Sequence, residues 1–467
     1  MSRINTNISS MQATNRLRLN NNDVSLRLQR LSSGLRVNAG KDDPAGLIAS
    51  ETLRSEIRGI SQAVDNSQRA NSVINTAEGA LNEVGSLLLE IQGLTNQAAN
   101  TGALSPEEIR ANQLQVDSIL TSVNRIANTT QFGGVKLLNG SLDFTTSGAA
   151  TSAISVININ AAKLPDNGTV NVTVEVTASA QLGQVIYTAS GISAVPTTIE
   201  ISGNGGTEQI SFAASAMNSA VAVAINQLRD STGVSAIVST NGDLILNSTA
   251  YGASQFVSVK TINGSFLSSK DSGLNASVNI NGSQAEVNGL TASVRNGDTD
   301  IQLNLTSAFG TQTGTTKNFF ITGGGAKFQL GSEVNRQGQV QIGIASVSTS
   351  KLGDDVVGFL SELGSGGNAS LVGGNTVAAQ KVITEAIRQV ATLRGRLGAL
   401  QKNVIETNIN SLNVALENVT SSESAIRDAD FATETAKLTR AQILVQANTS
   451  VLAQANATPQ NVLSLLQ

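Results

Sequence analysis

Apolar residues in the first third of the chain recur at the spacing of amphipathic helices. Two rows carry this pattern, and their steps alternate between three and four positions. The first row is Val24, Leu28, Leu31 and Leu35, and the second is Ala70, Val73, Ala77, Ala80, Val84, Leu87, Ile91, Leu94 and Ala98. Such spacing predicts helices that pack on other helices along a heptad seam.

Two start signals divide this helical third. Asp43-Pro44 predicts a capping residue followed by proline at the first helical position. Ser105 is followed three positions later by Glu108, which is the spacing of a capping box. We therefore expect helices to about residue 35, from 44 to about 98, and from 106 to about 128.

The middle of the chain changes to an alternating pattern. Valines at 170, 172, 174 and 176 alternate with polar residues, as do the segments 157–159 and 301–305, and this is the period of a β-strand. Turn pairs such as Asn204-Gly205, Asn241-Gly242 and Asn281-Gly282 separate the strands. With one helix expected from Ala213 to Leu228, residues 141–325 are predicted to form a mostly antiparallel β-rich insert.

The last third begins with a predicted hairpin over 328–344 and continues as a long helix from about residue 376. Its seam shifts by one position partway: Ala386, Val390, Leu393, Leu397, Leu400 and Val404 are followed by Ile405, Ile409, Leu412, Leu416 and Val419. At 1.5 Å per residue, roughly forty-five residues span roughly 65 Å, so this helix needs partners along its length. A final helical segment is expected from about Ser424.

Helical ends separated by a β-rich insert predict an α+β fold with a discontinuous α-helical coiled-coil bundle. Both termini contribute to the bundle, and the insert projects outward. The predicted parts are an N-terminal helix, 1–40; the N-terminal half of the coiled-coil domain, 41–140; a β-rich outer region, 141–325; the hairpin with the C-terminal half of the coiled-coil domain, 326–422; and a C-terminal helix, 423–467.

Both chain ends carry apolar stripes that nothing else in the sequence covers. Exposed stripes of this size are typical of partner interfaces. The candidate polymerisation core is Ile4, Ile8, Met11, Val24, Leu28, Leu31, Leu35, Leu438, Val445, Leu452, Val462, Leu463, Leu465 and Leu466. The alternative is a monomeric helical bundle with a β domain.

Composition narrows the possible chemistry. The chain has no His, Cys or Trp, so a Ser-His-Asp triad and the preferred ligands of zinc are missing. No convergent constellation of Asp, Glu, Lys, Ser or Tyr is found, and we expect a non-enzymatic protein without cofactors or metals. The net charge of −4 argues against nucleic-acid binding. The first forty residues carry an excess of basic side chains without interleaved aromatics. This pattern indicates a solvated helix face or charge pairing between subunits.

Targeting signals give a negative result. The N-terminus lacks the apolar core of a secretory signal, and no segment is apolar enough to cross a bilayer. We therefore expect that any export proceeds without a cleaved signal peptide, and we expect no membrane insertion.

Several ordered motifs resemble bacterial flagellin. Leu31–Gly46 reads LSSGLRVNAGKDDPAG, followed by Glu78–Glu83 (EGALNE) and Gln131–Leu138 (QFGGVKLL). The C-terminal blocks are IRDADF at Ile426–Phe431, AQAN at Ala453–Asn456 and PQNVLSLL at Pro459–Leu466. Within the insert, segments at 198–201, 224–226 and 233–236 are similar to the strand-helix-strand repeat of flagellins and hook-associated proteins.

The resemblance implies a subunit that polymerises into the flagellar filament for swimming motility, with its terminal helices in the inner tube. It also implies an extracellular location reached through the flagellar type III apparatus. The implied partners are further copies of the chain, an export chaperone on the C-terminal helix at about 428–467, the filament cap and hook-associated junction proteins.

The resemblance also identifies a patch that Toll-like receptor 5 recognises in some flagellins. The key arginine of that patch falls on Glu90 here, a neighbouring acidic residue falls on Gly93, and a second acidic contact falls on Gln115, whereas Leu94 is kept. Reversing a charge at a desolvated contact weakens binding, so we expect weak or absent activation. Alternatively, these positions only pack between protofilaments.

Of three alternatives to a filament subunit, the sequence excludes one. A hook–filament junction protein would share the Asp42–Gly46 region, although the ending from Pro459 favours flagellin. A metalloprotease insert would need a His-Glu-x-x-His helix, which a chain without His cannot form. A glycosylated or adhesive insert is allowed by sequons such as Asn171-Val172-Thr173.

Overall fold

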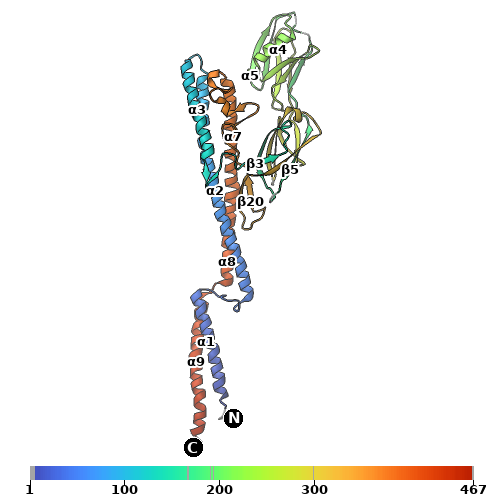
Figure 1. Cartoon of the computed structure of the whole chain (residues 1–467). Helices are drawn as coiled ribbons and strands as arrows, with labels where there is room; N and C mark the ends of the chain where they lie inside the picture. The colour runs from blue at the N-terminus through green and yellow to red at the C-terminus, as the bar shows by residue number, and fades with distance from the viewer. Residues whose placement is uncertain (1–5, 166–167, 190, 193, 298, 465–467) are drawn as a thin grey trace. The chain divides into compact units, whose positions relative to one another are not determined.

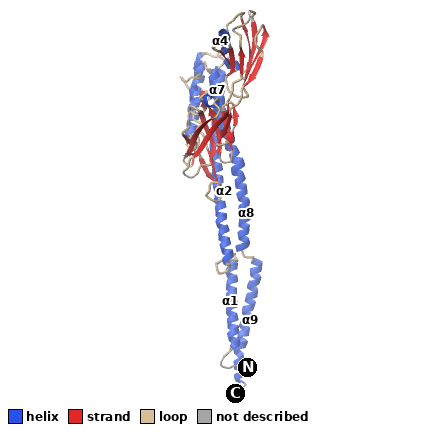
Figure 2. Ribbon diagram, turned by 90° about the vertical axis from the view of Figure 1, so that its right-hand side faces the viewer, coloured by secondary structure: helices blue, strands red, loops and turns tan. Residues whose placement is uncertain are grey.

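The computed structural model describes residues 6–464 apart from 166–167, 190, 193 and 298, with side chains as far as residue 458. It divides into two compact units. The first contains the chain up to residue 68, the segment 330–334 and the chain from 404 onward, and the second contains 69–329 and 335–403. Helices form both ends of the chain and strands form its middle (Figures 1 and 2), which confirms the predicted α+β class.

Six long helices account for the ends of the chain. They are α1 (Ile8–Ser33), α2 (Pro44–Ala98), α3 (Pro106–Thr129), α7 (Thr376–Leu400), α8 (Thr407–Arg427) and α9 (Phe431–Ser464). Both predicted start signals are confirmed. Asp43 Oδ1 accepts the Gly46 N–H at 2.9 Å, and Ser105 and Glu108 form the reciprocal capping box.

The predicted final helix from Ser424 is wrong at its start, because two helices meet there. The first of them, α8, ends at Arg427, and Asp428 has an extended backbone. The Asp430 side chain then accepts the Ala432 N–H at 3.0 Å and caps the start of α9. The break separates α8 from α9 by three residues.

The one-position shift in the C-terminal seam has a structural cause. Between α7 and α8 lies a π-helical segment, η3 (Gln401–Glu406). A π-turn accommodates one more residue than an α-turn. Leu397 and Ile405 are eight residues apart and both are buried, whereas Val404, at the regular α-helical spacing, is 38% exposed.

The bundle of the second unit is built from α3, α7 and the part of α2 after residue 68. The buried apolar row on α2 is Ala70, Ile74, Ala77, Leu81, Val84, Leu88, Ile91, Leu94 and Ala98. The predicted Val73, Ala80 and Leu87 are only half-buried, so alternate positions of the seam were placed one residue too early. Apolar residues occupy both members of the pairs 73–74, 80–81 and 87–88, and spacing alone does not distinguish them.

The insert is antiparallel in every strand pair that the structure describes. A five-stranded sheet has the order β14-β13-β5-β18-β3, and a six-stranded sheet has the order β15-β16-β17-β4-β20-β19. Their strands are β3 (Phe144–Ser147), β4 (Ile154–Ala162), β5 (Val170–Ala178), β13 (Ser277–Ile280), β14 (Ser283–Gln284), β15 (Glu286–Asn288), β16 (Thr291–Arg295), β17 (Thr299–Leu305), β18 (Thr315–Gly324), β19 (Ala326–Gln329) and β20 (Gln339–Ile342).

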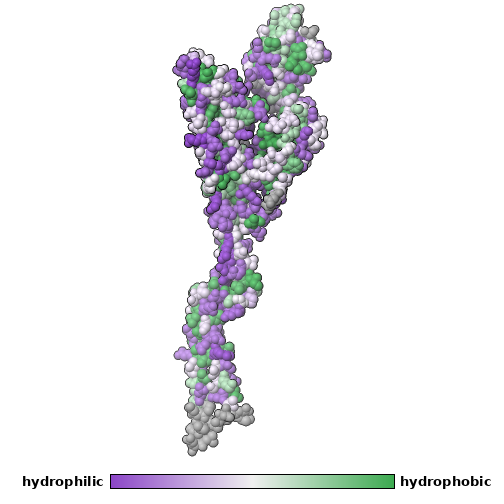
Figure 3. Space-filling model, in the orientation of Figure 1, coloured by the Kyte–Doolittle hydropathy of each residue, from purple (hydrophilic) through white to green (hydrophobic). Residues whose placement is uncertain are grey.

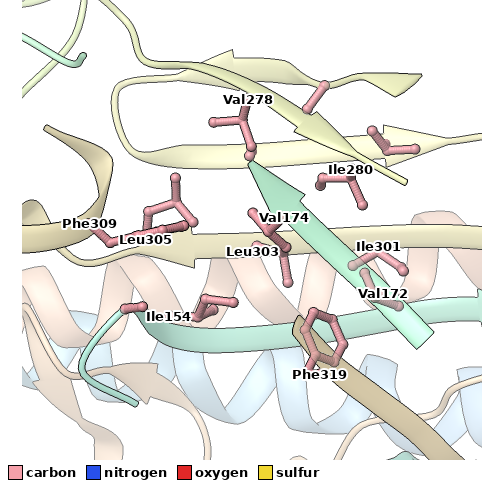
Figure 4. Close-up of a cluster of buried hydrophobic side chains, with 14 of the residues drawn as sticks. Ile154, Val172, Val174, Val278, Ile280, Ile301, Leu303, Leu305, Phe309 and Phe319 are labelled. Atoms are coloured by element: carbon pink, nitrogen blue, oxygen red, sulfur yellow. The ribbon is translucent and has the colours of Figure 1, made fainter. Parts of the chain in front are cut away.

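These two sheets share one apolar core. Side chains from both of them meet in it, and the labelled members include Val172 and Val174 from β5, Ile301 and Leu303 from β17, and Phe319 from β18 (Figure 4). The predicted valine alternation on β5 is confirmed, because Val172, Val174 and Val176 are fully buried.

A second core lies within residues 185–259. A four-stranded sheet of order β12-β11-β7-β8 and a three-stranded sheet of order β6-β10-β9 enclose it with helix α4. The elements are β6 (Gln184–Tyr187), β7 (Thr197–Gly203), β8 (Thr207–Phe212), α4 (Asn218–Gln227), α5 (Arg229–Thr232), β9 (Val234–Val238), β10 (Leu244–Ser248), β11 (Phe256–Asn263) and β12 (Ser269–Ser272). The predicted helix from Ala213 begins later, at Asn218, since Ser215 has a φ of 60°.

The predicted hairpin over 328–344 is present as β19 and β20. Strand β20 also pairs with β4, with Ile342 opposite Ala161. The hairpin therefore extends a sheet of the insert, beyond the predicted boundary at 325. The remaining short elements are β1 (Gln131–Phe132), β2 (Val135–Lys136), α6 (Ser307–Gly310), β21 (Gly353–Asp354), β22 (Gly358–Phe359), η1 (Leu360–Leu363) and η2 (Leu371–Gly373).

Candidate assembly surface

The two chain ends form a helix pair, with α1 and α9 side by side (Figures 1 and 2). The apolar residues buried between them are small: Ala13 on α1 and Ala441 and Ala455 on α9 are less than a tenth exposed. Small side chains allow two helix axes to approach closely. The pair is thin as a result and encloses few of its own large apolar side chains.

Hydrogen bonds join α1 and α9 near the start of α1. Asn7 caps α1 by accepting the Ser10 N–H at 3.0 Å, and its Nδ2 donates to the Ala455 carbonyl at 2.8 Å. Ser10 Oγ donates to Asn456 Oδ1 at 2.7 Å. These contacts fix the register of α1 against α9, although the two helices lie at opposite ends of the sequence.

An ion cluster joins the other end of the pair. Glu434 on α9 is 4% exposed. Arg27 of α1 lies 3.0 Å from one of its carboxylate oxygens and Arg30 lies 3.4 Å from the other. Asp23 and Lys437 complete the cluster. The basic face at the N-terminus is thus partly an intrachain pairing face.

The protonation of Glu434 follows from these partners. Burial by itself would raise its pKa, but the hydrogen bond and charge of Arg27 and the charges of Lys437 and Arg30 outweigh it, so the pKa of Glu434 lies below its usual range. A buried carboxylate paired in this way stays ionised near neutral pH.

Large apolar side chains remain on the outside of the pair. On α1 they are Ile8, Met11, Leu19 and Leu28, each at least 50% exposed, and on α9 they are Phe431, Ile443, Leu444 and Val451, each at least 42% exposed. We call these eight residues the terminal apolar surface. Figure 3 shows hydrophobic patches over α1 and α9 on the face in view. Exposed apolar patches are typical of an interaction surface.

The predicted polymerisation residues fall into three groups. Ile8, Met11 and Leu28 belong to the terminal apolar surface. Half-buried positions are Val24, Leu31, Leu35, Leu438, Val445 and Leu452. Ile4, Leu465 and Leu466 lie outside the described residues, as do the side chains of Val462 and Leu463.

Sequence reasoning missed Leu19, Phe431, Ile443, Leu444 and Val451. A signal for two of them was present. Leu444-Val445 and Val451-Leu452 are adjacent apolar pairs separated by seven positions, and adjacent helical residues point to different faces. A helix with such pairs carries two apolar faces, of which one can pack on α1.

The segment that follows α1 is hydrogen-bonded to the segment that precedes α9. Leu35 and Asp428 form an isolated antiparallel bridge, the Ala429 N–H donates to the Gly34 carbonyl at 2.9 Å, and the Arg36 N–H donates to the Arg427 carbonyl at 2.7 Å. Arg427 also contacts Glu51 of α2 at 3.0 Å. Both chain segments that enter the α1–α9 pair are therefore held by one set of backbone contacts.

The predicted coiled-coil seam residues differ in burial. Val84, Ile91, Leu94, Leu393 and Leu397 are buried. Half-buried members are Val73, Leu87, Leu400, Ile409, Leu412 and Leu416. The helix α8 has no fully buried residue among its 21, so its apolar row is covered only in part by the chain itself.

At the predicted receptor patch, Glu90 and Gln115 are exposed and contact one another. Gln115 Nε2 donates to Glu90 Oε1 at 2.9 Å. Leu94 is only 9% exposed and lies in the bundle core. An acidic side chain and an amide therefore face solvent where the resemblance implies a basic and an acidic one.

Other kinds of site find little support in the described part of the chain. No group of three or more His, Cys, Asp or Glu residues there is placed to bind a metal ion. The described helices contain no stretch that is long and apolar enough to pass through a membrane.

Comparisons with known proteins agree across the whole sequence. Residues 4–143 match the bacterial flagellin N-terminal helical region, 380–466 match its C-terminal helical region, and 198–250 match the flagellin hook IN motif. A Salmonella typhimurium flagellin is 32% identical over 99% of each chain, and the B-type flagellin of Pseudomonas aeruginosa is also 32% identical over 99% of each.

Among solved structures, FliC from Burkholderia pseudomallei covers 71% of this chain and 98% of its own, with 16% identity and a TM-score of 0.28. Because that score is low, the family assignment depends on the sequence matches. Matches at both ends and over the full length place this chain in the bacterial flagellin family, whose members are the structural subunits of the flagellar filament.

Proposed function

We propose that copies of this flagellin join in the filament core through the terminal apolar surface of α1 and α9. The main support is the composition of the pair, with alanines inside and eight large apolar side chains outside. Burying one large apolar side chain contributes about 1.5–3 kcal/mol. Repeated in every copy, such burial favours polymerisation.

The proposed parts follow the same division. The inner core consists of residues 1–40 and 423–467, the outer region includes 141–325, and the sequence between them belongs to the coiled-coil domain. The half-buried row on α8 supports a role for that helix in contacts between copies.

Truncation at the C-terminus tests the proposed core. Removing Val462–Gln467 should leave the insert folded and abolish or strongly slow polymerisation, because apolar residues of the core are lost. Sedimentation and electron microscopy measure the polymer, and near-ultraviolet circular dichroism from the two tyrosines, Tyr187 and Tyr251, reports on the insert.

A substitution pair serves as the control. Leu444→Ser on α9 replaces a 42%-exposed apolar side chain of the proposed interface by a polar one. Val195→Ser makes the same kind of change at a 53%-exposed apolar side chain of the insert. We expect only Leu444→Ser to weaken assembly. Normal filaments from both the truncation and Leu444→Ser would refute the interface.

The proposed partners beyond further copies come from family resemblance. An export chaperone would cover α9 within 428–467, and the exposed Phe431, Ile443 and Leu444 give it an apolar face to bind. The filament cap and the hook-associated junction proteins would contact the chain at the two ends of the polymer. Export would proceed through the flagellar type III apparatus to the outside of the cell.

We further propose that this flagellin activates Toll-like receptor 5 weakly or not at all. Glu90 presents a negative charge where the recognised patch is basic, and Gln115 is bonded to it. A reporter-cell assay with purified monomer measures this, with Glu90→Arg expected to increase the response. Strong activation by the unmodified chain would contradict the proposal.

A further inference from the structure

Asn-Gly pairs are sites where a protein chain can modify itself without an enzyme. The glycine nitrogen attacks the asparagine side-chain carbonyl, and glycine exposes that nitrogen because it has no Cβ. The sequence has eight such pairs, at Asn139, Asn167, Asn204, Asn241, Asn263, Asn281, Asn288 and Asn296. The structure describes all of these asparagines except Asn167.

At Asn263 the two reacting groups face one another. The Gly264 N–H points at the Asn263 Oδ1, with 2.9 Å between nitrogen and oxygen. Both residues are exposed to solvent. Asn263 ends β11 just after a bulge in its pairing with β7, and Gly264 has a φ of 87°. Reacting groups that already lie close together lose less entropy on the way to the transition state.

In three other pairs the glycine nitrogen is engaged elsewhere. The Gly205 N–H donates to the Thr232 carbonyl at 3.1 Å, and the Gly242 N–H donates to the Ser239 carbonyl at 2.9 Å. The N–H of Gly289, which follows Asn288, donates to Asn275 Oδ1 at 3.0 Å. The attacking atom is turned away from the asparagine in each case.

In the remaining three pairs the asparagine side chain is engaged elsewhere. Asn139 Oδ1 accepts the Ser141 N–H at 3.0 Å, Asn281 Oδ1 accepts the Thr173 N–H at 2.8 Å, and Asn296 Oδ1 accepts the Thr299 N–H at 2.7 Å. These bonds hold the carbonyl against a nitrogen that is not the attacking one.

We infer that Asn263 is the preferred site of spontaneous deamidation in the folded chain. Solvent hydroxide removes the Gly264 amide proton, and the nitrogen forms a bond to Asn263 Cγ. The Cγ–Nδ2 bond then breaks as the NH2 group takes a proton from water and leaves as ammonia. Water then opens the five-membered imide at either carbonyl. The products are aspartyl and isoaspartyl residues, each with a new carboxylate.

The modification changes both charge and backbone. Each event makes the net charge more negative than the −4 of the unmodified chain. The isoaspartyl product adds a methylene group to the backbone where Asn263 pairs with Thr198. Assembled filaments would accumulate this change with age at the connection between β11 and β12.

The test is a time course on the full chain at neutral and mildly alkaline pH, followed by peptide mapping and isoaspartate labelling. The Asn263 peptide should convert several-fold faster than the peptides containing Asn204, Asn241 and Asn288, and faster at higher pH. In concentrated urea the Asn-Gly pairs should react at similar rates, because the folded contacts that distinguish them are gone.

Two variants identify the site. Asn263→Gln keeps the amide but disfavours the five-membered ring and should remove the leading isoaspartate signal, whereas Asn241→Gln should leave it. Gly264→Ala is unsuitable because an added Cβ would collide with Pro196 and Thr197. The inference is overturned if another described pair reacts as fast as Asn263 in the folded chain, or if urea leaves the ranking unchanged.

Discussion

Two neighbouring phenylalanines show how burial sets the importance of a residue. Phe319 and Phe320 follow one another on β18, and successive side chains of a strand point to opposite faces. Phe319 is fully buried in the core shared by the five-stranded and six-stranded sheets, whereas Phe320 is 42% exposed. Chemically identical side chains therefore make unequal contributions to the stability of the insert.

Alanine substitution at these two positions gives a matched prediction. Phe319→Ala should lower the free energy of unfolding of the insert by about 3–5 kcal/mol through transfer and cavity terms, and Phe320→Ala by about 1 kcal/mol or less. The near-ultraviolet signal of Tyr251, which packs against this core, follows the transition. Equal losses in the two variants would contradict the assigned core.

Glu434 carries the second prediction at this scale. Replacing it by Gln leaves Arg27 and Arg30 without their buried carboxylate, and breaking a buried pair costs about 3–5 kcal/mol. Filaments of Glu434→Gln should dissociate at a lower temperature, as measured by light scattering. Glu417→Gln, at an exposed position of α8, is the control and should have little effect.

The same carboxylate predicts a dependence on acid. Since the pKa of Glu434 is lowered in the fold, its stabilising contribution is complete above the ordinary value of about 4.5 and is lost as pH falls through the lowered pKa. Wild-type filaments should weaken in that acid range. The dissociation temperature of Glu434→Gln should change less over the same range, and parallel curves for the two proteins would argue against this role.

Among the helices, η3 left a visible signal in the sequence, the one-position shift of the apolar row. The sequence did not show the structural cause of that shift. The apolar row moves by one position after Val404, and the extra residue lies in the π-turn. Sequence spacing detects such a shift because apolar residues continue on both sides of it. It does not show whether the helix breaks, kinks or widens, since those outcomes depend on packing against neighbouring elements.

Single-residue deletions test this explanation. Deleting the exposed Asn403 reduces the separation of Leu397 and Ile405 from eight to the seven of a regular seam, so the far-ultraviolet melting temperature should stay the same or rise. Deleting the exposed Gly395 from regular α7 rotates the seam by about 100° and should lower it by several degrees. Equal destabilisation by both deletions would rule out a removable extra residue.

Element boundaries followed the sequence where capping chemistry is local. Pro44, Pro106 and the Asn281-Gly282 turn between β13 and β14 were all predicted, and both residues of that turn have positive φ. The pairing of β20 with β4 was not predicted, because it joins residues far apart in sequence. The choice between Val73 and Ile74 failed for a similar reason, because it depends on partner helices.

For the whole molecule, composition and termini were the most informative features of the sequence. The absence of His and Cys excluded most catalytic and metal sites before any fold was considered. The terminal apolar surface was only partly predicted. An apolar stripe on α9 can either pack on α1 or stay exposed to solvent, and the positions of the buried alanines decide which of the two occurs. A monomer that leaves such residues exposed is consistent with a subunit completed by its neighbours.

A reconstruction of the assembled filament at side-chain resolution tests the central claim most directly. We predict that Met11, Leu28, Leu444 and Val451, all exposed in the single chain, are buried against neighbouring copies in the filament core, with Glu434 still paired to Arg27. A filament held by contacts of the insert, with these four side chains still exposed to water, would contradict the claim.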